Sequence, residues 1–204
     1  QYDKKKLYIG KAEEILSKFE DGTIDLICTS PPYGDNPTTV TYGQYSILPL
    51  FWIDRTDLGE FDEQLIANYS SIDSNSLGGN QRVRSSFESS VLNDFLSRID
   101  DKKQDKVKNF VLDYLNVMTE LVRILKVGKY IVLTLGNRRV DNRVVPLSTI
   151  TMEYLESHGF ILEKMITRNI PKKRMPRKVS KVYGNSVESM NQEYVLILKK
   201  IENR

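Results

Sequence analysis

Apolar residues recur along the chain in two rhythms, one typical of helices and one of buried strands. Near the start, the apolar segment 7–9 predicts a short strand, and three- and four-residue spacing over 12–19 predicts a helix that ends at Asp21-Gly22. The run 24–29 predicts a strand covered on both faces, as in a parallel sheet. The prolines of segment 30–34 must end this strand, because proline cannot donate a ladder hydrogen bond.

The same alternation returns in the C-terminal half. An apolar stripe over 106–125 predicts a long helix, with Lys126 in its last turn and Gly128 just beyond its end. The remaining elements are predicted at 130–135 (strand), 146–158 (helix), 160–167 (strand) and 193–199 (strand). Strands that alternate with helices favour an α/β fold with a mainly parallel sheet.

Between these two ordered parts, residues 36–105 carry little regular signal. Residues 69–90 hold eight serines and a glycine pair, which predicts a loop. Helical pieces are expected near 61–69 and 87–99. Because long loops inside compact domains are usually functional, we expect this insertion to face the substrate.

Composition fits one globular domain and excludes several other classes of protein. The chain has 204 residues, 40% apolar and 28% charged, which is enough for one well-buried domain. No stretch reaches the roughly 18–20 apolar residues of a membrane-spanning helix. The first residues lack the apolar core of a secretory signal, so we expect a cytoplasmic protein with no membrane partner.

The single cysteine and the single histidine limit the available chemistry. One cysteine excludes an internal disulfide and a zinc site made of several thiolates, and one histidine argues against a multi-histidine metal site or a Ser-His-Asp triad. No metal site is therefore predicted. Cys28 is expected in the core of its strand, and His158 is expected to cap a helix end.

The formal net charge of +3 includes a local concentration of basic residues. The segment 171–181 contains no acidic residue and six basic ones: Lys172, Lys173, Arg174, Arg177, Lys178 and Lys181. A smaller group, Arg138, Arg139 and Arg143, follows the strand predicted at 130–135. Such runs are typical of solvated surface and of phosphate-binding sites, and the pattern alone leaves both open.

The most specific feature is Thr29-Ser30-Pro31-Pro32-Tyr33, at the carboxyl end of the predicted strand 24–29. Ligands bind at such strand ends in open α/β sheets. With the apolar run before it, this motif resembles that of the amino-group DNA methyltransferases, which methylate cytosine at N4 or adenine at N6. The resemblance covers about residues 7–35 and 107–199.

The resemblance implies that a methyl group moves from S-adenosylmethionine to a flipped base of double-stranded DNA, as in a restriction-modification system. Ser30 and the Pro31 carbonyl would accept hydrogen bonds from the exocyclic amino group, with Pro31 and Pro32 fixing the geometry. Tyr33 would stack on the base. The serine of the motif favours cytosine N4, and adenine N6 stays open.

The same resemblance suggests roles for residues outside the tetrapeptide. Thr29 and Asn137 are candidate cofactor contacts, although Asn137 is equally well explained as a turn residue. The basic residues of 171–181 would contact DNA phosphates close to the target base.

The part of the family pattern that binds the cofactor is missing. No strand is followed by a Gly-rich turn, and Lys11 stands where the family has the acidic residue of Gly-Asp-Ala. We therefore expect a partial Rossmann-like methyltransferase sheet that lacks the cofactor-binding strand. Residues 1–204 would form a single incomplete catalytic domain, with 36–105 as a DNA-facing insertion.

Without that strand, the strand at 24–29 would expose an apolar edge. A second subunit with the Gly-rich motif, a longer chain that was cut, or rearranged self-association would have to cover it. A non-catalytic DNA-binding subunit of the same fold is a competing hypothesis. So is a methyltransferase for RNA or for small molecules.

Overall fold

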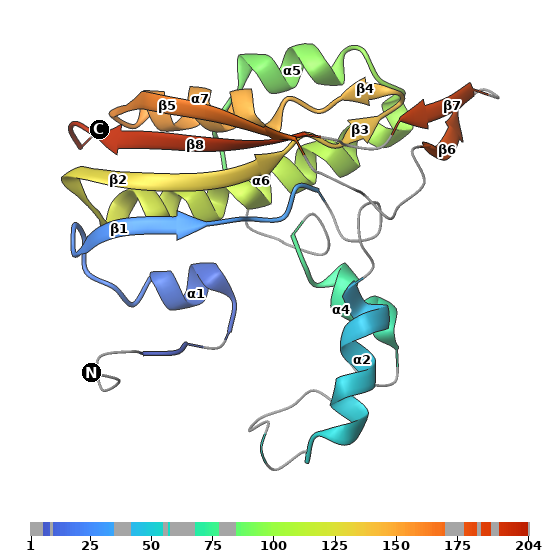
Figure 1. The fold of residues 1–204 in the computed structure, drawn as a ribbon, viewed down its shortest axis with the longest axis horizontal. Helices are drawn as coiled ribbons and strands as arrows, with labels where there is room; N and C mark the ends of the chain where they lie inside the picture. The colour runs from blue at the N-terminus through green and yellow to red at the C-terminus, as the bar shows by residue number, and fades with distance from the viewer. Residues whose placement is uncertain are drawn as a thin grey trace.

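The structure of the chain, a computed structural model, describes residues 6–8, 10–34, 42–54, 57, 68–77, 85–169, 178–182, 185–188 and 192–203 (Figure 1). The helices are α1 (Ala12–Leu16), α2 (Tyr42–Trp52), α4 (Tyr69–Ser74), α5 (Ser90–Leu96), α6 (Asp101–Ile124) and α7 (Leu147–Ser157). The strands are β1 (Ile24–Thr29), β2 (Leu125–Gly136), β3 (Arg139–Val140), β4 (Arg143–Val144), β5 (Phe160–Asn169), β6 (Lys178–Val182), β7 (Asn185–Glu188) and β8 (Gln192–Lys200). Within this part of the chain, no helix is both long and apolar enough to cross a membrane.

A four-stranded sheet in the order β1-β2-β8-β5 forms the centre of the fold. β1 pairs with β2 in parallel, whereas β8 runs antiparallel to both of its neighbours, β2 and β5. The α/β fold is confirmed. The prediction of a mainly parallel sheet is wrong for the pairing, because β8 enters between two strands that share one direction, and it makes both of its ladders antiparallel.

The helices α6 and α7 lie on one face of this sheet, and the buried core lies between (Figure 1). Alternate residues of β2 point into that core, and Leu133 and Leu135 are completely buried. Leu196 of β8, which lies opposite Leu133, is buried on the same face. Hydrophobic burial on this face therefore determines which residues of each central strand point inward.

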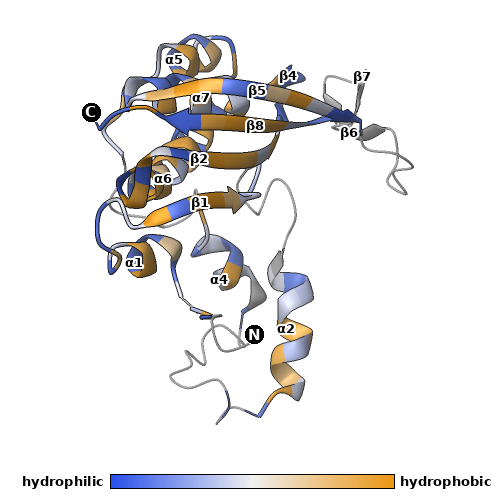
Figure 2. Cartoon of the chain, turned by 60° about the vertical axis from the view of Figure 1, so that its left-hand side comes forward, coloured by the Kyte–Doolittle hydropathy of each residue, from blue (hydrophilic) through white to orange (hydrophobic). Residues whose placement is uncertain are grey.

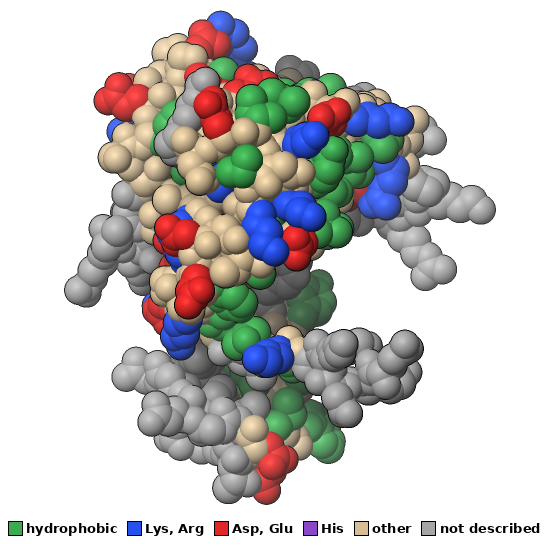
Figure 3. Space-filling model, turned by 90° about the vertical axis from the view of Figure 1, so that its left-hand side faces the viewer, with side chains coloured by type: hydrophobic (Ala, Val, Ile, Leu, Met, Phe, Trp, Pro, Cys, Tyr) green, Lys and Arg blue, Asp and Glu red, His purple; other side chains and the backbone are tan. Residues whose placement is uncertain are grey.

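The other face of the sheet is open in the described part of the chain. Leu26 of β1 is 59% exposed, and Ile166 of β5 is 43% exposed. Figure 2 shows hydrophobic stretches along all four strands, and Figure 3 shows hydrophobic side chains at the surface beside Lys and Arg side chains. The large apolar side chains on this face have no described helix over them.

Two predictions about β1 are wrong for the same reason. The strand was expected to be covered on both faces, and Cys28 was expected in the core, but only Ile27 is buried and Cys28 is exposed. β1 is an edge strand whose alternate side chains, those of Leu26 and Cys28, point to the open face. The apolar edge that the sequence predicts is therefore present.

The N-terminal segment forms no strand in its described part, contrary to the prediction for 7–9. Leu7 and Tyr8 are irregular and exposed, and Ile9 lies outside the described residues. The Tyr8 ring instead packs edge-on against Phe19, with 5.5 Å between the ring centroids. The segment follows the helix region after it rather than the sheet. The helix itself is confirmed as α1, shorter than predicted.

The long helix α6 begins and ends away from its predicted positions. It begins at Asp101, because the Asp100 carboxylate caps the first turn by accepting a hydrogen bond from the Lys102 backbone nitrogen at 2.9 Å. It ends directly before β2, so Lys126 and Gly128 lie in the strand rather than at the helix end. Gly128 takes a positive φ of 82°, which a glycine adopts without strain.

The segment 36–105 contains more helix than its sequence indicates. α2 was not predicted, and α4 occupies the start of the stretch 69–90 that predicts a loop. The side chain of Asn68 caps α4 by accepting a backbone hydrogen bond at 3.0 Å. The helix predicted near 87–99 is confirmed as α5, and only the end of the piece predicted near 61–69 is described.

The C-terminal elements are confirmed close to their predicted bounds. α7 follows Pro146, and β5 and β8 occupy the two predicted closing strands. His158 is the C-cap residue of α7, and its Nδ1 lies 2.8 Å from the Tyr154 carbonyl oxygen. The predicted capping role of His158 is therefore confirmed.

Candidate functional site

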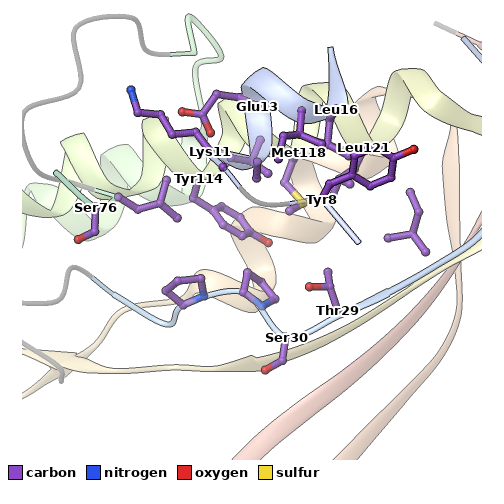
Figure 4. Close-up of a pocket in the computed structure, with 18 of the residues that line it drawn as sticks. Tyr8, Lys11, Glu13, Leu16, Thr29, Ser30, Ser76, Tyr114, Met118 and Leu121 are labelled. Carbon is purple, nitrogen blue, oxygen red and sulfur yellow. The ribbon is translucent and has the colours of Figure 1, made fainter. Parts of the chain in front are cut away.

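The predicted motif forms a corner where β1 ends. β1 stops at Thr29, and residues 30–33 leave the sheet as an irregular segment because two prolines follow in succession. A cavity of about 900 Å³ lies beside this corner. Its wall combines the corner with α1, α6 and residues 75–77 (Figure 4). The motif thus lines an accessible cavity and is not packed in the interior.

The cavity has an apolar wall and a polar rim. α6 contributes Tyr114, Met118 and Leu121 to the wall opposite the corner. At the rim, Lys11 and Glu13 come from the start of α1, and the Lys11 ammonium forms an ion pair with Glu14 at 3.2 Å. Cavities of this size with an apolar lining and a few polar groups are typical of sites for small molecules.

The corner has two chemically different sides. Thr29 and the two prolines line the cavity, whereas the Ser30 hydroxyl turns away from the α6 wall (Figure 4). Ser30 is exposed and Tyr33 is partly buried. A ligand in the cavity and a second ligand near the two hydroxyl groups would therefore meet at the corner.

Ser30 and Tyr33 belong to a hydrogen-bond network that reaches across the sheet, named here the corner network (Ser30, Tyr33, Glu193 and Arg168). The Tyr33 hydroxyl donates to Glu193 Oε1 at 3.2 Å, and Ser30 Oγ lies 3.2 Å from the same Tyr33 oxygen. Arg168 donates from Nε to Glu193 Oε2 at 3.0 Å and also from Nη2 to the same oxygen. This network ties the corner after β1 to β8 and β5.

The sheet register explains how the network forms. Arg168 and Glu193 lie directly opposite each other on β5 and β8, so the ion pair is a cross-strand pair. On the other side of β8, the residue opposite Glu193 is Gly136, the last residue of β2. Because glycine has no side chain, β2 places no side chain between Glu193 and the corner.

The environment of Tyr33 raises the pKa of its hydroxyl above the usual value of 10.0. Partial burial is the main cause, and the Glu193 carboxylate adds to it. Ser30 opposes the shift by donating to the phenol oxygen. Tyr33 is therefore a neutral hydrogen-bond donor to Glu193 at neutral pH.

Sequence reasoning missed both Glu193 and Arg168. Glu193 lies 160 residues from Tyr33 along the chain, and the two meet only because β8 lies inside the sheet. The sequence does place Glu193 at the start of a strand, but a pattern of apolar residues cannot tell which strand end lies beside the corner.

The other predicted site residues have varied positions. Thr29 lines the cavity, as expected for a cofactor contact. Asn137 is not in the cavity wall: its Oδ1 accepts from the Ser148 backbone nitrogen at 3.2 Å, and its Nδ2 donates to the Ser148 hydroxyl at 3.2 Å. Asn137 thus binds the first turn of α7, in keeping with a structural role, and its cofactor role stays a prediction.

Only part of the predicted DNA-binding segment can be placed. Lys178 and Lys181 lie on β6, which pairs with β7. The other four basic residues lie outside the described residues: Lys172, Lys173, Arg174 and Arg177. In the smaller basic group, Arg138 is buried and stacks over the Phe110 ring, 5.7 Å from its centroid, so that it is not a surface contact for phosphate.

Comparisons with known proteins agree with this geometry. No family model matches the chain. It is 31% identical over 200 residues to the Type II methyltransferase M.MvaI of Kocuria varians, a match that covers 94% of this chain and 43% of that protein. The chain therefore spans less than half the length of this relative.

Solved structures share the fold over the same partial length. The PvuII DNA methyltransferase (cytosine-N4-specific) matches with a TM-score of 0.50 and 15% identity, over 96% of this chain and 49% of that one. A Thermus thermophilus protein, solved as a DNA modification methylase in complex with S-adenosyl-L-methionine, gives a TM-score of 0.47 with 18% identity, covering 96% of this chain and 55% of its own. The chain is thus homologous to a segment of a Type II methyltransferase and has part of a methyltransferase fold.

Proposed function

We propose that this chain is the target-base part of an S-adenosylmethionine-dependent DNA methyltransferase that acts on the N4 amino group of cytosine. The observation that carries this proposal is the exposed Ser30–Tyr33 corner at the carboxyl end of β1, with a cavity beside it. The serine in the motif and the fold shared with a cytosine-N4-specific enzyme favour cytosine. Adenine N6 is the alternative target.

The corner residues offer what an exocyclic amino group needs in order to react. This nitrogen is a poor nucleophile, because its lone pair is delocalised into the ring. Ser30 Oγ and the Pro31 carbonyl accept hydrogen bonds from its two N–H groups and help to localise the lone pair. The two prolines hold both acceptors in place beforehand, and the Tyr33 ring offers a stacking surface worth roughly 1–3 kcal/mol per base.

The residues of the cavity fit S-adenosylmethionine in part. The wall formed by Tyr114, Met118 and Leu121 suits a flat adenine ring, and Thr29 adds a hydroxyl group close to the corner. Lys11 does not fit the family pattern, because its ammonium group cannot accept a hydrogen bond from the adenine amino group. When bound, this cofactor supplies a methyl group on a positively charged sulfur.

The transfer balances without a covalent enzyme intermediate. The amino nitrogen forms a bond to the methyl carbon, the electron pair of the sulfur–methyl bond stays on sulfur, and the nitrogen loses one proton to water. The chain contributes the corner, which orients the amino group for this attack. Ser30 is a weak base, so direct attack with later proton loss is the expected course.

A second polypeptide segment completes the proposed enzyme. β1 has β2 as its only neighbour in the described sheet, and Leu26 on its open face is 59% exposed. More than half of the homologous methyltransferase lies outside the match. We expect a segment with the Gly-rich cofactor motif to pair with the free edge of β1, either as a separate subunit or as part of a longer polypeptide.

Methyl transfer to double-stranded DNA by the native complex that contains this chain tests the proposal. Radiolabelled S-adenosylmethionine reports transfer, and chromatography of the hydrolysed DNA separates N4-methylcytosine from N6-methyladenine. Ser30→Ala and Tyr33→Ala should abolish transfer while circular dichroism stays unchanged. Ser97→Ala, at an exposed serine after α5, should have no effect.

The results distinguish the competing functions. Wild-type rates in both corner variants would overturn the proposal. If the chain binds DNA and the complex methylates normally with Tyr33→Ala, the chain is a non-catalytic DNA-binding subunit, a function favoured by Lys11 and by the missing Gly-rich turn. Preferential salt-dependent binding to RNA would indicate an RNA substrate.

A further inference from the structure

The corner network has a single direction of hydrogen bonding. The Glu193 carboxylate accepts bonds only, and both Arg168 and Tyr33 donate to it. A phenol has one proton, so Tyr33, which gives its proton to Glu193, can only accept from Ser30. The Ser30 proton is therefore directed at Tyr33, and its two lone pairs remain for a ligand.

We infer that Glu193 is a positioning residue that keeps Ser30 oriented as a pure hydrogen-bond acceptor, so that the corner selects a ring with an amino group over one with a carbonyl group. This inference rests on the proposed function and deepens it. An amino group presents two donors to these lone pairs, whereas a carbonyl oxygen would meet another acceptor and leave both groups unpaired, which carries a penalty.

The position of Glu193 is well defined. Its side chain is 12% exposed, whereas that of Arg168 is 64% exposed. The cross-strand register holds the two opposite each other, and the two bonds from Arg168 converge on Oε2. Oε1 is thereby left to Tyr33. Arg168 thus determines which carboxylate oxygen faces the corner.

Glu193→Gln is a sharp test because it reverses the direction of the network with almost no change in shape. Arg168 offers only donors, so the amide oxygen of this variant should turn to Arg168 and its NH2 group to Tyr33. Tyr33 would then donate to Ser30, and the Ser30 proton would point toward the incoming amino group. Donor would face donor at the site of reaction.

We expect Glu193→Gln to lower kcat for DNA methylation about 10- to 100-fold in the native complex, the size of one charge-assisted hydrogen bond lost from the transition state. Because the change affects orientation rather than DNA contact, the Kd for duplex DNA should stay within about 2-fold of wild type. Glu163→Gln, at an exposed position on β5, is the matched control and should leave both quantities unchanged.

A second variant separates orientation from general damage to the fold. Ser30→Asp replaces the hydroxyl with a carboxylate, which is an acceptor whatever Tyr33 does. If Glu193 acts through Ser30, then Glu193→Gln should cost nothing in the Ser30→Asp background. A merely structural role for Glu193 would lower the rate equally in both backgrounds.

The outcomes are distinguishable. Loss of kcat in Glu193→Gln, with unchanged DNA binding and no further loss in the Ser30→Asp background, supports the inference. If wild type methylates DNA and Glu193→Gln does so at the same rate, or if the loss is equal in both backgrounds, the inference alone is overturned. A wild-type complex that transfers no methyl group overturns the proposed function together with the inference.

Discussion

The Tyr114 hydroxyl on α6 lies 2.9 Å from Thr151 Oγ1 on α7, and both side chains are completely buried. Thr151 donates its proton to the Leu147 carbonyl at 2.7 Å, so Tyr114 is the donor in the pair. The two helices on the covered face of the sheet are therefore joined by a polar bond inside an apolar core. Burial also raises the pKa of Tyr114 well above the usual range.

Thr151→Val should reduce the free energy of unfolding by about 1–3 kcal/mol, because it keeps the shape of the side chain but leaves the Tyr114 hydroxyl buried without its acceptor. Chemical denaturation measures the loss. The double variant Tyr114→Phe with Thr151→Val should recover part of it. If the double variant is as unstable as the sum of the two single variants, the bond has no such role.

The pKa of Tyr33 should fall in Glu193→Gln, because the Glu193 carboxylate helps to raise it. The difference in ultraviolet titration between each protein and its Tyr33→Phe counterpart isolates this one tyrosine. In wild type the folded state holds the proton more tightly than the unfolded state. The Tyr33 contribution to stability is thus complete below the unfolded pKa near 10 and is lost as the pH rises through the folded pKa. An unchanged titration in Glu193→Gln would show that the two groups do not interact in solution.

The two faces of the sheet should respond differently to the same substitution. Leu133→Ala removes a completely buried side chain from β2 and should cost about 2–5 kcal/mol of unfolding free energy. Leu26→Ala, on the exposed face of β1, should change the stability of the isolated chain very little. Instead, it should weaken association with the segment that completes the enzyme. Equal losses for the two variants would mean that the open face is covered within the chain itself.

Two glycines with similar backbone angles should differ in their tolerance of a side chain. Gly159 has a φ of 80°, and a Cβ there would lie 2.6 Å from the Glu202 carbonyl oxygen. Gly22 has a φ of 58°, and a Cβ there meets nothing within 4 Å. Gly159→Ala should therefore lower the melting temperature clearly more than Gly22→Ala, as measured by thermal denaturation. Equal shifts would show that backbone strain alone sets the cost.

The local part of the site could be predicted from the sequence. The corner at Ser30–Tyr33 follows from an apolar run stopped by two prolines, and every residue that forms it lies within one short segment. The helix α7 with its capping residue His158 is predictable for the same reason. Each depends on neighbours along the chain, which the sequence displays directly.

The rest of the site depends on tertiary structure and could not be predicted. Glu193 reaches Tyr33 because β8 enters the sheet antiparallel, and the pattern of apolar residues carries no information on strand direction. The apolar run of β1 suggests a buried strand, but Cys28 is exposed because the strand lies at an edge. Arg138 counts as a surface charge in the sequence, yet it packs over Phe110 inside the fold.

The position of β8 also determines when the sheet can form during synthesis. β2 and β5 have no ladder with each other, and each is joined to the sheet through β8, residues 192–200. A ribosome must therefore translate and release this segment before the two halves can close around it. Until then the apolar sides of β2 and β5 lack their shared neighbour. Such contacts between distant parts of a sequence slow folding, so the nascent polypeptide depends on chaperones longer than one whose sheet grows from its first strands.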